Sequence, residues 1–127
     1  MPDKVRTRVL VIEDEEILLK VFITYLARAG YEADFALDGK VGLEKVKTFR
    51  PNLVITDLVM PGLDGFAVIE ELRRNPVTKS IPIIVISALG EPDQTERALR
   101  LGANDFLTKG DLNLAHMVEK VGEYVKP

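Results

Sequence analysis

The sequence predicts an α/β fold built on a doubly wound parallel sheet, and three observations carry this prediction. Three short apolar runs lack polar alternation, which is typical of strands buried on both faces; they are Val9–Ile12, Leu53–Ile55 and Ile83–Ile86. Segments long enough for helices separate the runs and end at glycine or before proline. The length of 127 residues suits one domain with a single core.

Five helices are expected from capping residues at their starts and from breakers at their ends. Their predicted limits are, in order, about Glu15 to Ala29 with a stop at Gly30, from after Asp38 to before Pro51, from after Asp64 to before Pro76, from near Pro92 to Gly102, and from after Asp111. Weaker strand candidates at Ala33–Ala36 and Phe106–Thr108 complete about five βα units. No internal repeat is present, so we expect one domain over residues 1–127.

Composition excludes several classes of protein. A net charge of −3 argues against direct binding of nucleic acid, because that binding depends on neutralising phosphates. The absence of cysteine excludes disulfides and thiolate metal sites. No apolar run approaches the roughly 20 residues of a membrane helix, and the first residues lack an apolar signal core. We therefore expect a cytoplasmic protein without membrane contact.

Polar side chains follow the predicted strands at their carboxyl ends. Glu13 and Asp14 follow the first strand, Asp57 ends the third, Ser87 ends the fourth and Lys109 follows the fifth. Ligands of open α/β sheets bind outside these ends, so we expect the residues to share one crevice. Grouped carboxylates require a cation, and hard oxygen ligands suit Mg²⁺. We predict direct ligation by Asp14 and Asp57, with Glu13 reaching the ion through water.

The same residues suit the formation of an aspartyl phosphate. A carboxylate can act as the nucleophile, and charge on the phosphoryl oxygens must then be neutralised. Mg²⁺ and Lys109 supply positive charge, while the Ser87 hydroxyl and nearby backbone N–H groups donate hydrogen bonds. Taken singly, Asp57, Ser87 and Lys109 are more simply turn or surface residues. Their joint placement at strand ends favours the functional interpretation.

Three other polar residues are expected to have no catalytic or metal-binding role. Glu15 and Glu16 are expected to be charges at a helix N-terminus, where acidic side chains are stabilising. His116 is the single histidine of the chain, and we expect it on the surface of the last helix.

The runs VLVIEDEE, VITDLVMPGLDG, IIVISA and GANDFLTKG together resemble the receiver domain of bacterial response regulators, over almost the whole chain. The resemblance implies a flavodoxin-like sheet of five parallel strands in order 2-1-3-4-5 with five flanking helices. It implies Mg²⁺ ligation by Glu13, Asp14, Asp57 and the backbone carbonyl of Val59. Asp57 is then expected to accept a phosphoryl group from a phosphohistidine of a histidine kinase or histidine phosphotransfer protein.

The resemblance also implies a signalling switch of two-component or phosphorelay systems rather than an enzyme. Such a switch assists its own phosphorylation and dephosphorylation. Ser87 and Phe106 correspond to the switch pair, in which the hydroxyl turns toward the phosphoryl group and the aromatic ring moves inward. Static core packing is the alternative for Phe106. The output surface is expected around the fourth helix, the fifth strand and the fifth helix.

The sequence departs from the family at Gly110, where a proline joined by a cis peptide usually follows the lysine. Two geometries stay open: a strained cis bond, or a trans bond with the loop of Lys109 placed differently. In both cases we expect Lys109 to reach the site.

Three other functions fit the sequence less well. An aspartate-dependent phosphatase needs a second acid two residues after its nucleophile, where Val59 stands here. A nucleotide binder needs a glycine- or hydroxyl-rich phosphate loop after the first strand, and an acidic loop there repels phosphate. A receiver that serves only as an interaction module conflicts with the intact set of site residues.

Two finer expectations concern partners and lifetime. The apolar residues of the first helix cover more than a core-facing stripe needs, so Leu19 and Ile23 are predicted to be partly exposed and to dock a kinase or phosphotransfer helix. The other possibility is wider burial in the core. The family resemblance puts Val59 and Leu89 at the two positions best placed to orient a water that attacks the phosphoryl group. Neither side chain can hydrogen-bond that water, which predicts slow self-dephosphorylation. The other possibility is that both residues only pack in their loops and the lifetime is set elsewhere.

Overall fold

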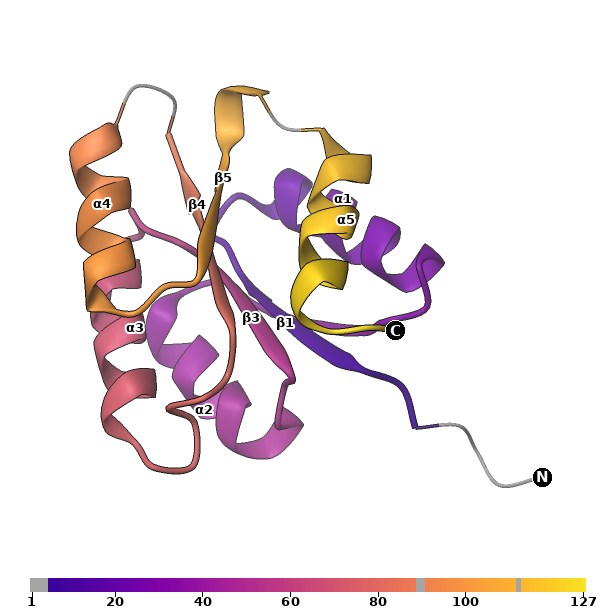
Figure 1. Cartoon of the computed structure of the whole chain (residues 1–127), viewed down its shortest axis with the longest axis horizontal. Helices are drawn as coiled ribbons and strands as arrows, with labels where there is room; N and C mark the ends of the chain where they lie inside the picture. The colour runs from indigo at the N-terminus through magenta and orange to yellow at the C-terminus, as the bar shows by residue number, and fades with distance from the viewer. Residues whose placement is uncertain (1–4, 89–90, 112) are drawn as a thin grey trace.

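A single parallel sheet forms the centre of the molecule, as Figure 1 shows. The structure is a computed structural model that describes residues 5–88, 91–111 and 113–127. In this described part the sheet has five strands in the order β2-β1-β3-β4-β5, so the predicted fold class is confirmed. The strands are β1 (Arg8–Ile12), β2 (Glu32–Ala36), β3 (Leu53–Asp57), β4 (Ile83–Ser87) and β5 (Asp105–Thr108).

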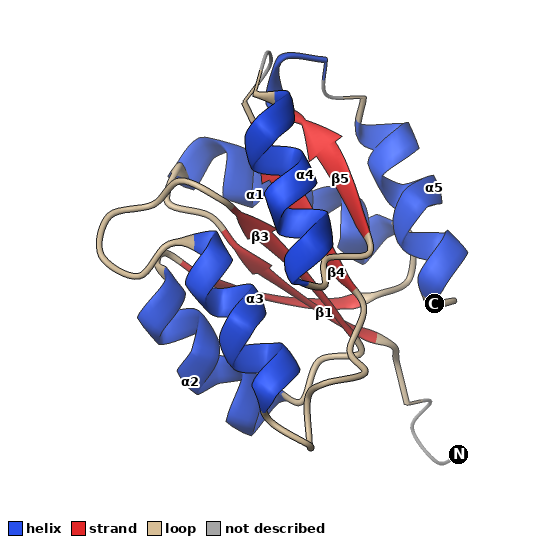
Figure 2. Cartoon of the chain, turned by 60° about the vertical axis from the view of Figure 1, so that its left-hand side comes forward, coloured by secondary structure: helices blue, strands red, loops and turns tan. Residues whose placement is uncertain are grey.

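Helices cover both faces of the sheet (Figures 1 and 2). α1 and α5 lie on one face, and α2, α3 and α4 lie on the other. Their bounds are α1 (Glu16–Arg28), α2 (Gly39–Phe49), α3 (Gly65–Arg74), α4 (Pro92–Leu101) and α5 (Leu114–Tyr124), with a short 3₁₀ turn at Lys109–Asp111 before α5.

Successive residues of each central strand enter two different cores. On β1, Val9 and Val11 pack with α1 and α5, whereas Leu10 and Ile12 pack with α2, α3 and α4. This follows from the period of two along a strand, and it explains why the runs show no polar alternation. Both faces of β1 are therefore buried from Val9 to Ile12.

The predicted helix limits agree with the structure at four helices and are wrong at the fifth. α5 begins at Leu114 and not directly after Asp111. Residues 109–111 form the 3₁₀ turn, and the side chain of Asn113 accepts a hydrogen bond from the backbone N–H of His116. Asn113 is therefore the N-cap of α5, two residues after Asp111, where the sequence placed the start of the helix.

The exposure of the first helix differs from the prediction. Leu19 is only 4% exposed and packs in the core with Phe22 and Leu26, so the predicted exposure of Leu19 is wrong. Ile23 is only partly buried, so its predicted partial exposure is confirmed. The large apolar side chains that α1 exposes are Ile17 at 82% and Tyr25 at 37%. The apolar band of α1 is so broad that its sequence does not set which edge faces the sheet.

Two further features concern the backbone and the surface. Every peptide bond of the described residues is trans, including the one between Lys109 and Gly110. Within the same residues, no helix has the length and apolarity needed to cross a membrane.

Candidate active site

Three carboxylates meet at the carboxyl ends of the neighbouring strands β1 and β3. Glu13 and Asp14 directly follow β1, and Asp57 is the last residue of β3. One carboxylate oxygen from each lies within 4.8 Å of the other two. Glu13 and Asp57 are buried and Asp14 is exposed, so the cluster has a wet side and a dry side. The predicted convergence of these three residues is confirmed.

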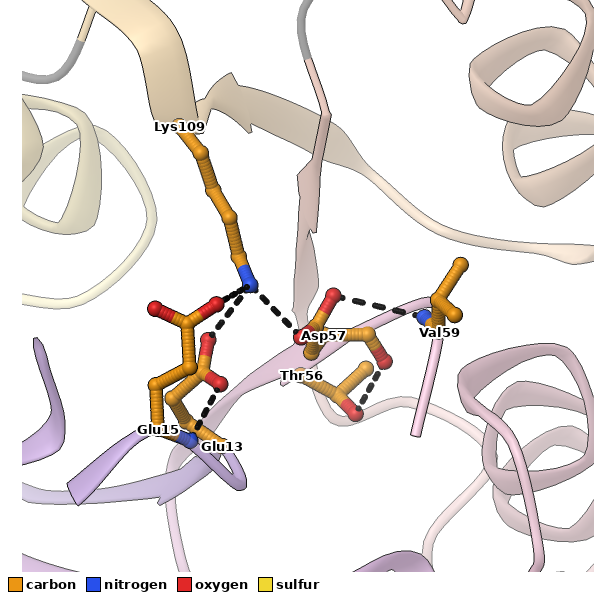
Figure 3. A network of polar contacts seen from close by, with 6 residues as sticks. All are labelled: Glu13, Glu15, Thr56, Asp57, Val59 and Lys109. Carbon is orange, nitrogen blue, oxygen red and sulfur yellow. Dashed lines mark hydrogen bonds and ion pairs between the residues drawn. The ribbon is translucent and has the colours of Figure 1, made fainter. Parts of the chain in front are cut away.

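Lys109 is the cation of this cluster (Figure 3). Its Nζ donates hydrogen bonds of 2.9 Å to Asp57 Oδ2 and to Glu15 Oε1, and it lies 3.3 Å from Glu13 Oε1. The side chain comes from the end of β5 and extends across the edge of the sheet. The expectation that Lys109 reaches the site beside Gly110 is therefore confirmed.

Glu15 is the site residue that the sequence interpretation missed. It is the N-cap of α1 without a side-chain capping bond, and its carboxylate pairs with Lys109 instead. The expectation that Glu15 is only a helix-terminal charge is therefore wrong. The sequence indicates only that Glu15 lies two residues from the site residue Glu13. Its partner Lys109 is 94 residues away along the chain, so the pairing could not be predicted.

The two carboxylate oxygens of Glu13 have different partners. Glu13 Oε2 accepts from the backbone N–H of Glu15 at 2.9 Å, whereas the buried Glu13 Oε1 has no hydrogen bond in the described part of the chain and only the ion-pair contact with Lys109 at 3.3 Å. Burial and, to a smaller degree, the nearby charge of Asp57 raise the pKa of Glu13 to about 7. Burial lowers the pKa of Lys109, but the hydrogen bonds to Asp57 and Glu15 outweigh this, and the pKa is raised above its ordinary value.

The backbone around Asp57 holds its carboxylate at the edge of the sheet. The backbone N–H of Val59 donates to Asp57 Oδ1 at 3.3 Å, and the hydroxyl of Thr56 donates to the Asp57 carbonyl at 3.0 Å (Figure 3). The start of α3 packs against this strand end, since a Cβ at Gly65 would lie 2.1 Å from the Asp57 carbonyl oxygen. Any other residue at position 65 must therefore displace α3 or the strand end.

Ser87 and Phe106 lie on neighbouring strands beside the cluster. Ser87 ends β4 and is 3% exposed, and the preceding Ile86 is the register partner of Asp57. Phe106 on β5 is 40% exposed, so its ring is not packed in the core. The two residues line a groove between β5 and α4 together with Thr95 and Leu99.

Three remaining residues of the sequence analysis are Val59, Leu89 and His116. Val59 is 63% exposed on the loop after β3, and the ligand role of its carbonyl stays a prediction. Leu89 lies outside the described residues. His116 is exposed on α5, as expected.

The sequence comparison assigns the family. The pattern described as "Response regulator receiver domain" matches residues 9–121, and this chain belongs to that family. The protein is thus a receiver domain of the kind used as a signalling switch in two-component systems.

Named relatives agree with this assignment. The chain is 38% identical over 104 residues to "Probable transcriptional regulator ycf27" of Porphyridium aerugineum, covering 82% of this chain and 42% of that protein. It is 36% identical over 102 residues to "Response regulator PleD" of Caulobacter vibrioides, covering 80% of this chain and 22% of that protein. The chain thus spans less than half the length of these curated relatives.

A solved structure shows the same fold. The crystal structure of a putative response regulator from Chloroflexus aurantiacus superposes with a TM-score of 0.90 at 28% identity. The match covers 94% of this chain and 98% of that chain.

Proposed function

We propose that Asp57 accepts a phosphoryl group from a phosphohistidine in a Mg²⁺-dependent reaction, and that the acyl phosphate switches a partner-binding surface. One observation carries the proposal: a buried carboxylate at a strand end is paired with Lys109 at 2.9 Å inside a cluster of acids. This combines a nucleophile with a cation that can follow the phosphoryl charge.

The donor set fits Mg²⁺. Three carboxylate oxygens lie within 4.8 Å of one another, and one buried oxygen of Glu13 lacks a hydrogen-bond partner among the described residues. Hard oxygen ligands on an open, partly wet site are the ligands that Mg²⁺ prefers. Glu13, Asp14, Asp57 and the Val59 carbonyl are the proposed ligands. When bound, the ion neutralises phosphoryl oxygens and so makes the carboxylate approachable by an anionic donor.

The residues of the chain divide the transfer among them. The phosphorus–nitrogen bond of the phosphohistidine breaks as a phosphorus–oxygen bond to Asp57 forms, and the imidazole leaves after taking up one proton. Lys109 pairs with Asp57 before transfer and with a phosphoryl oxygen afterwards. The backbone N–H of Val59 orients the carboxylate, and the Ser87 hydroxyl becomes a donor to the phosphoryl group.

The output follows from the same movement. When Ser87 turns toward the phosphoryl group, the ring of Phe106 loses its outward position and packs inward. The groove lined by both residues then changes shape, which alters the surface of α4, β5 and α5. The exposed and apolar Val59 stands where an aspartate phosphatase needs a second acid, which supports a switch over a turnover enzyme.

The test is phosphorylation by a small donor such as acetyl phosphate, followed by intact-mass measurement. We expect one added phosphoryl group with Mg²⁺, none in excess chelator, and none in Asp57→Asn. Asp93→Asn is the matched control, because Asp93 is an exposed acid at the start of α4 outside the cluster. Equal labelling of Asp57→Asn and wild type contradicts the proposal.

A further inference from the structure

The hydroxyl of Ser87 has a buried neighbour to which the proposed function gives no role. Thr95 lies on α4, and its Oγ1 is 3.2 Å from Ser87 Oγ. Thr95 is 9% exposed and Ser87 is 3% exposed, so bulk water does not readily replace this contact. Thr95 Oγ1 also lies 3.3 Å from the backbone carbonyl oxygen of Glu91, one turn earlier.

Counting protons leaves two arrangements of these bonds. The single proton of the Thr95 hydroxyl can be donated either to Ser87 Oγ or to the carbonyl of Glu91, which can only accept. When Thr95 donates to that carbonyl, the proton between the two hydroxyls comes from Ser87. This arrangement satisfies both buried hydroxyls, and a buried hydroxyl left unpaired is costly.

We propose that Thr95 is a positioning residue that holds the Ser87 hydroxyl toward α4 until Asp57 is phosphorylated. The inference rests on the proposed function, since it needs a phosphoryl group as the competing acceptor. Ser87 has a single hydroxyl proton and cannot donate it to Thr95 and to a phosphoryl oxygen at once. Phosphorylation therefore ends the donation from Ser87 to Thr95, across the one side-chain contact that joins the end of β4 to α4 among the described residues.

This bond lies at the groove that carries the output. Ser87, Thr95 and Phe106 all line the groove between β5 and α4. Thr95 lies on the α4 wall of the groove and Phe106 lies on the β5 wall. When Ser87 no longer donates to Thr95, α4 is less constrained at this groove. The stronger the Ser87–Thr95 bond, the more phosphoryl signal is needed to switch the surface.

The test uses beryllium fluoride with Mg²⁺ as a stable mimic of the phosphoryl group. The readout is the concentration that gives half of the change in the NMR signals of the α4 amides. Thr95→Val keeps the shape but removes the hydroxyl, and we expect it to lower this concentration about fivefold, the size of one neutral hydrogen bond. Thr95→Ser keeps the hydroxyl and is expected to behave like wild type. In a Ser87→Ala background, Thr95→Val is expected to have no further effect.

The outcomes separate the two proposals. If the wild-type protein responds to the mimic and Thr95→Val needs the same half-change concentration of beryllium fluoride, the role of Thr95 is overturned and the proposed function is not. The same holds if Thr95→Val acts equally strongly in the Ser87→Ala background, because the effect is then merely structural. A wild-type protein that neither responds to the mimic nor accepts a phosphoryl group overturns both proposals. If Thr95→Val does not fold, Thr95→Ala supplies the same comparison.

Discussion

At the scale of single residues, Glu15 shares the ammonium of Lys109 with Asp57 and adds negative charge at the mouth of the cluster. Glu15→Gln is predicted to weaken Mg²⁺ binding up to about fivefold, since the charge is largely exposed and screened. Titration of the chain with Mg²⁺ measures this. Glu16→Gln is the matched control, because Glu16 is a neighbouring exposed acid outside the cluster. Equal weakening by both variants removes the specific role of Glu15.

A second residue-scale prediction concerns the lifetime of the acyl phosphate. Val59 exposes an apolar side chain on the loop directly after Asp57, where it cannot orient an attacking water. Val59→Asn, alone or with Leu89→Glu, is predicted to speed loss of the phosphoryl group about tenfold by positioning that water. Phosphate release over time measures the rate, and Val77→Asn is an exposed valine control far along the chain. Decay no faster than wild type, with Mg²⁺ binding intact, refutes the explanation.

At the scale of elements, Asp105 joins β5 to α5. It accepts from Lys120 at 2.9 Å and from the hydroxyl of Tyr124 at 3.1 Å. Burial alone raises the pKa of Asp105, but these bonds and the one from the Phe106 N–H outweigh it and hold the pKa below its ordinary value of 3.8. The lowered pKa stabilises the folded chain above pH 3.8, and this contribution is lost as the pH falls through the lowered pKa.

Asp105→Asn is therefore predicted to lower the free energy of unfolding by about 1–2 kcal/mol at pH 7. The gap between variant and wild type should narrow as the pH falls below 3.8. Urea unfolding at a series of pH values measures it. A gap that stays constant across the series contradicts the role of the carboxylate charge.

A second prediction at this scale concerns Arg73, which connects α3 to the loops that precede β4 and β5. Its guanidinium donates to the carbonyls of Gly102, Lys79 and Ile81 and to the side chain of Asn104. Arg73→Met is predicted to cost about 2–3 kcal/mol of unfolding free energy, since several acceptors lose their partner.

The neighbouring Arg74 supplies the control for Arg73. It is exposed and pairs with Glu71 one turn earlier, so Arg74→Met should change stability by less than about 0.5 kcal/mol. Urea unfolding of both variants makes the comparison. Similar losses for the two arginines would show that the Arg73 contacts contribute no more than a surface charge.

At the scale of the whole molecule, the sequence predicts strands and helices well wherever burial is two-sided or capping is clear. β1, β3 and β4 match the apolar runs to within two residues, because both of their faces are dry. β2 gave only a weak signal, since it lies at the edge of the sheet and is partly exposed. The strand order came from the family resemblance, because periodicity contains no information about which strands are neighbours.

The candidate site was predictable for a different reason. Its acids follow strands directly, and parallel strands bring their carboxyl ends to one edge. Glu15, Arg73 and Thr95 were not predictable, because each contacts a partner set by the tertiary fold, and their local sequence reads as an ordinary helix. Leu19 was placed on the wrong side for the same reason: only packing fixes the rotation of α1.

The central claim is that Asp57 becomes an acyl phosphate. Borohydride reduces an aspartyl phosphate to homoserine, so treatment of the phosphorylated protein followed by peptide mapping reads the modified residue directly. We expect homoserine at position 57 in samples phosphorylated with Mg²⁺ and not in samples with excess chelator. Homoserine at another position, or a phosphate that survives borohydride on serine or threonine, would contradict it.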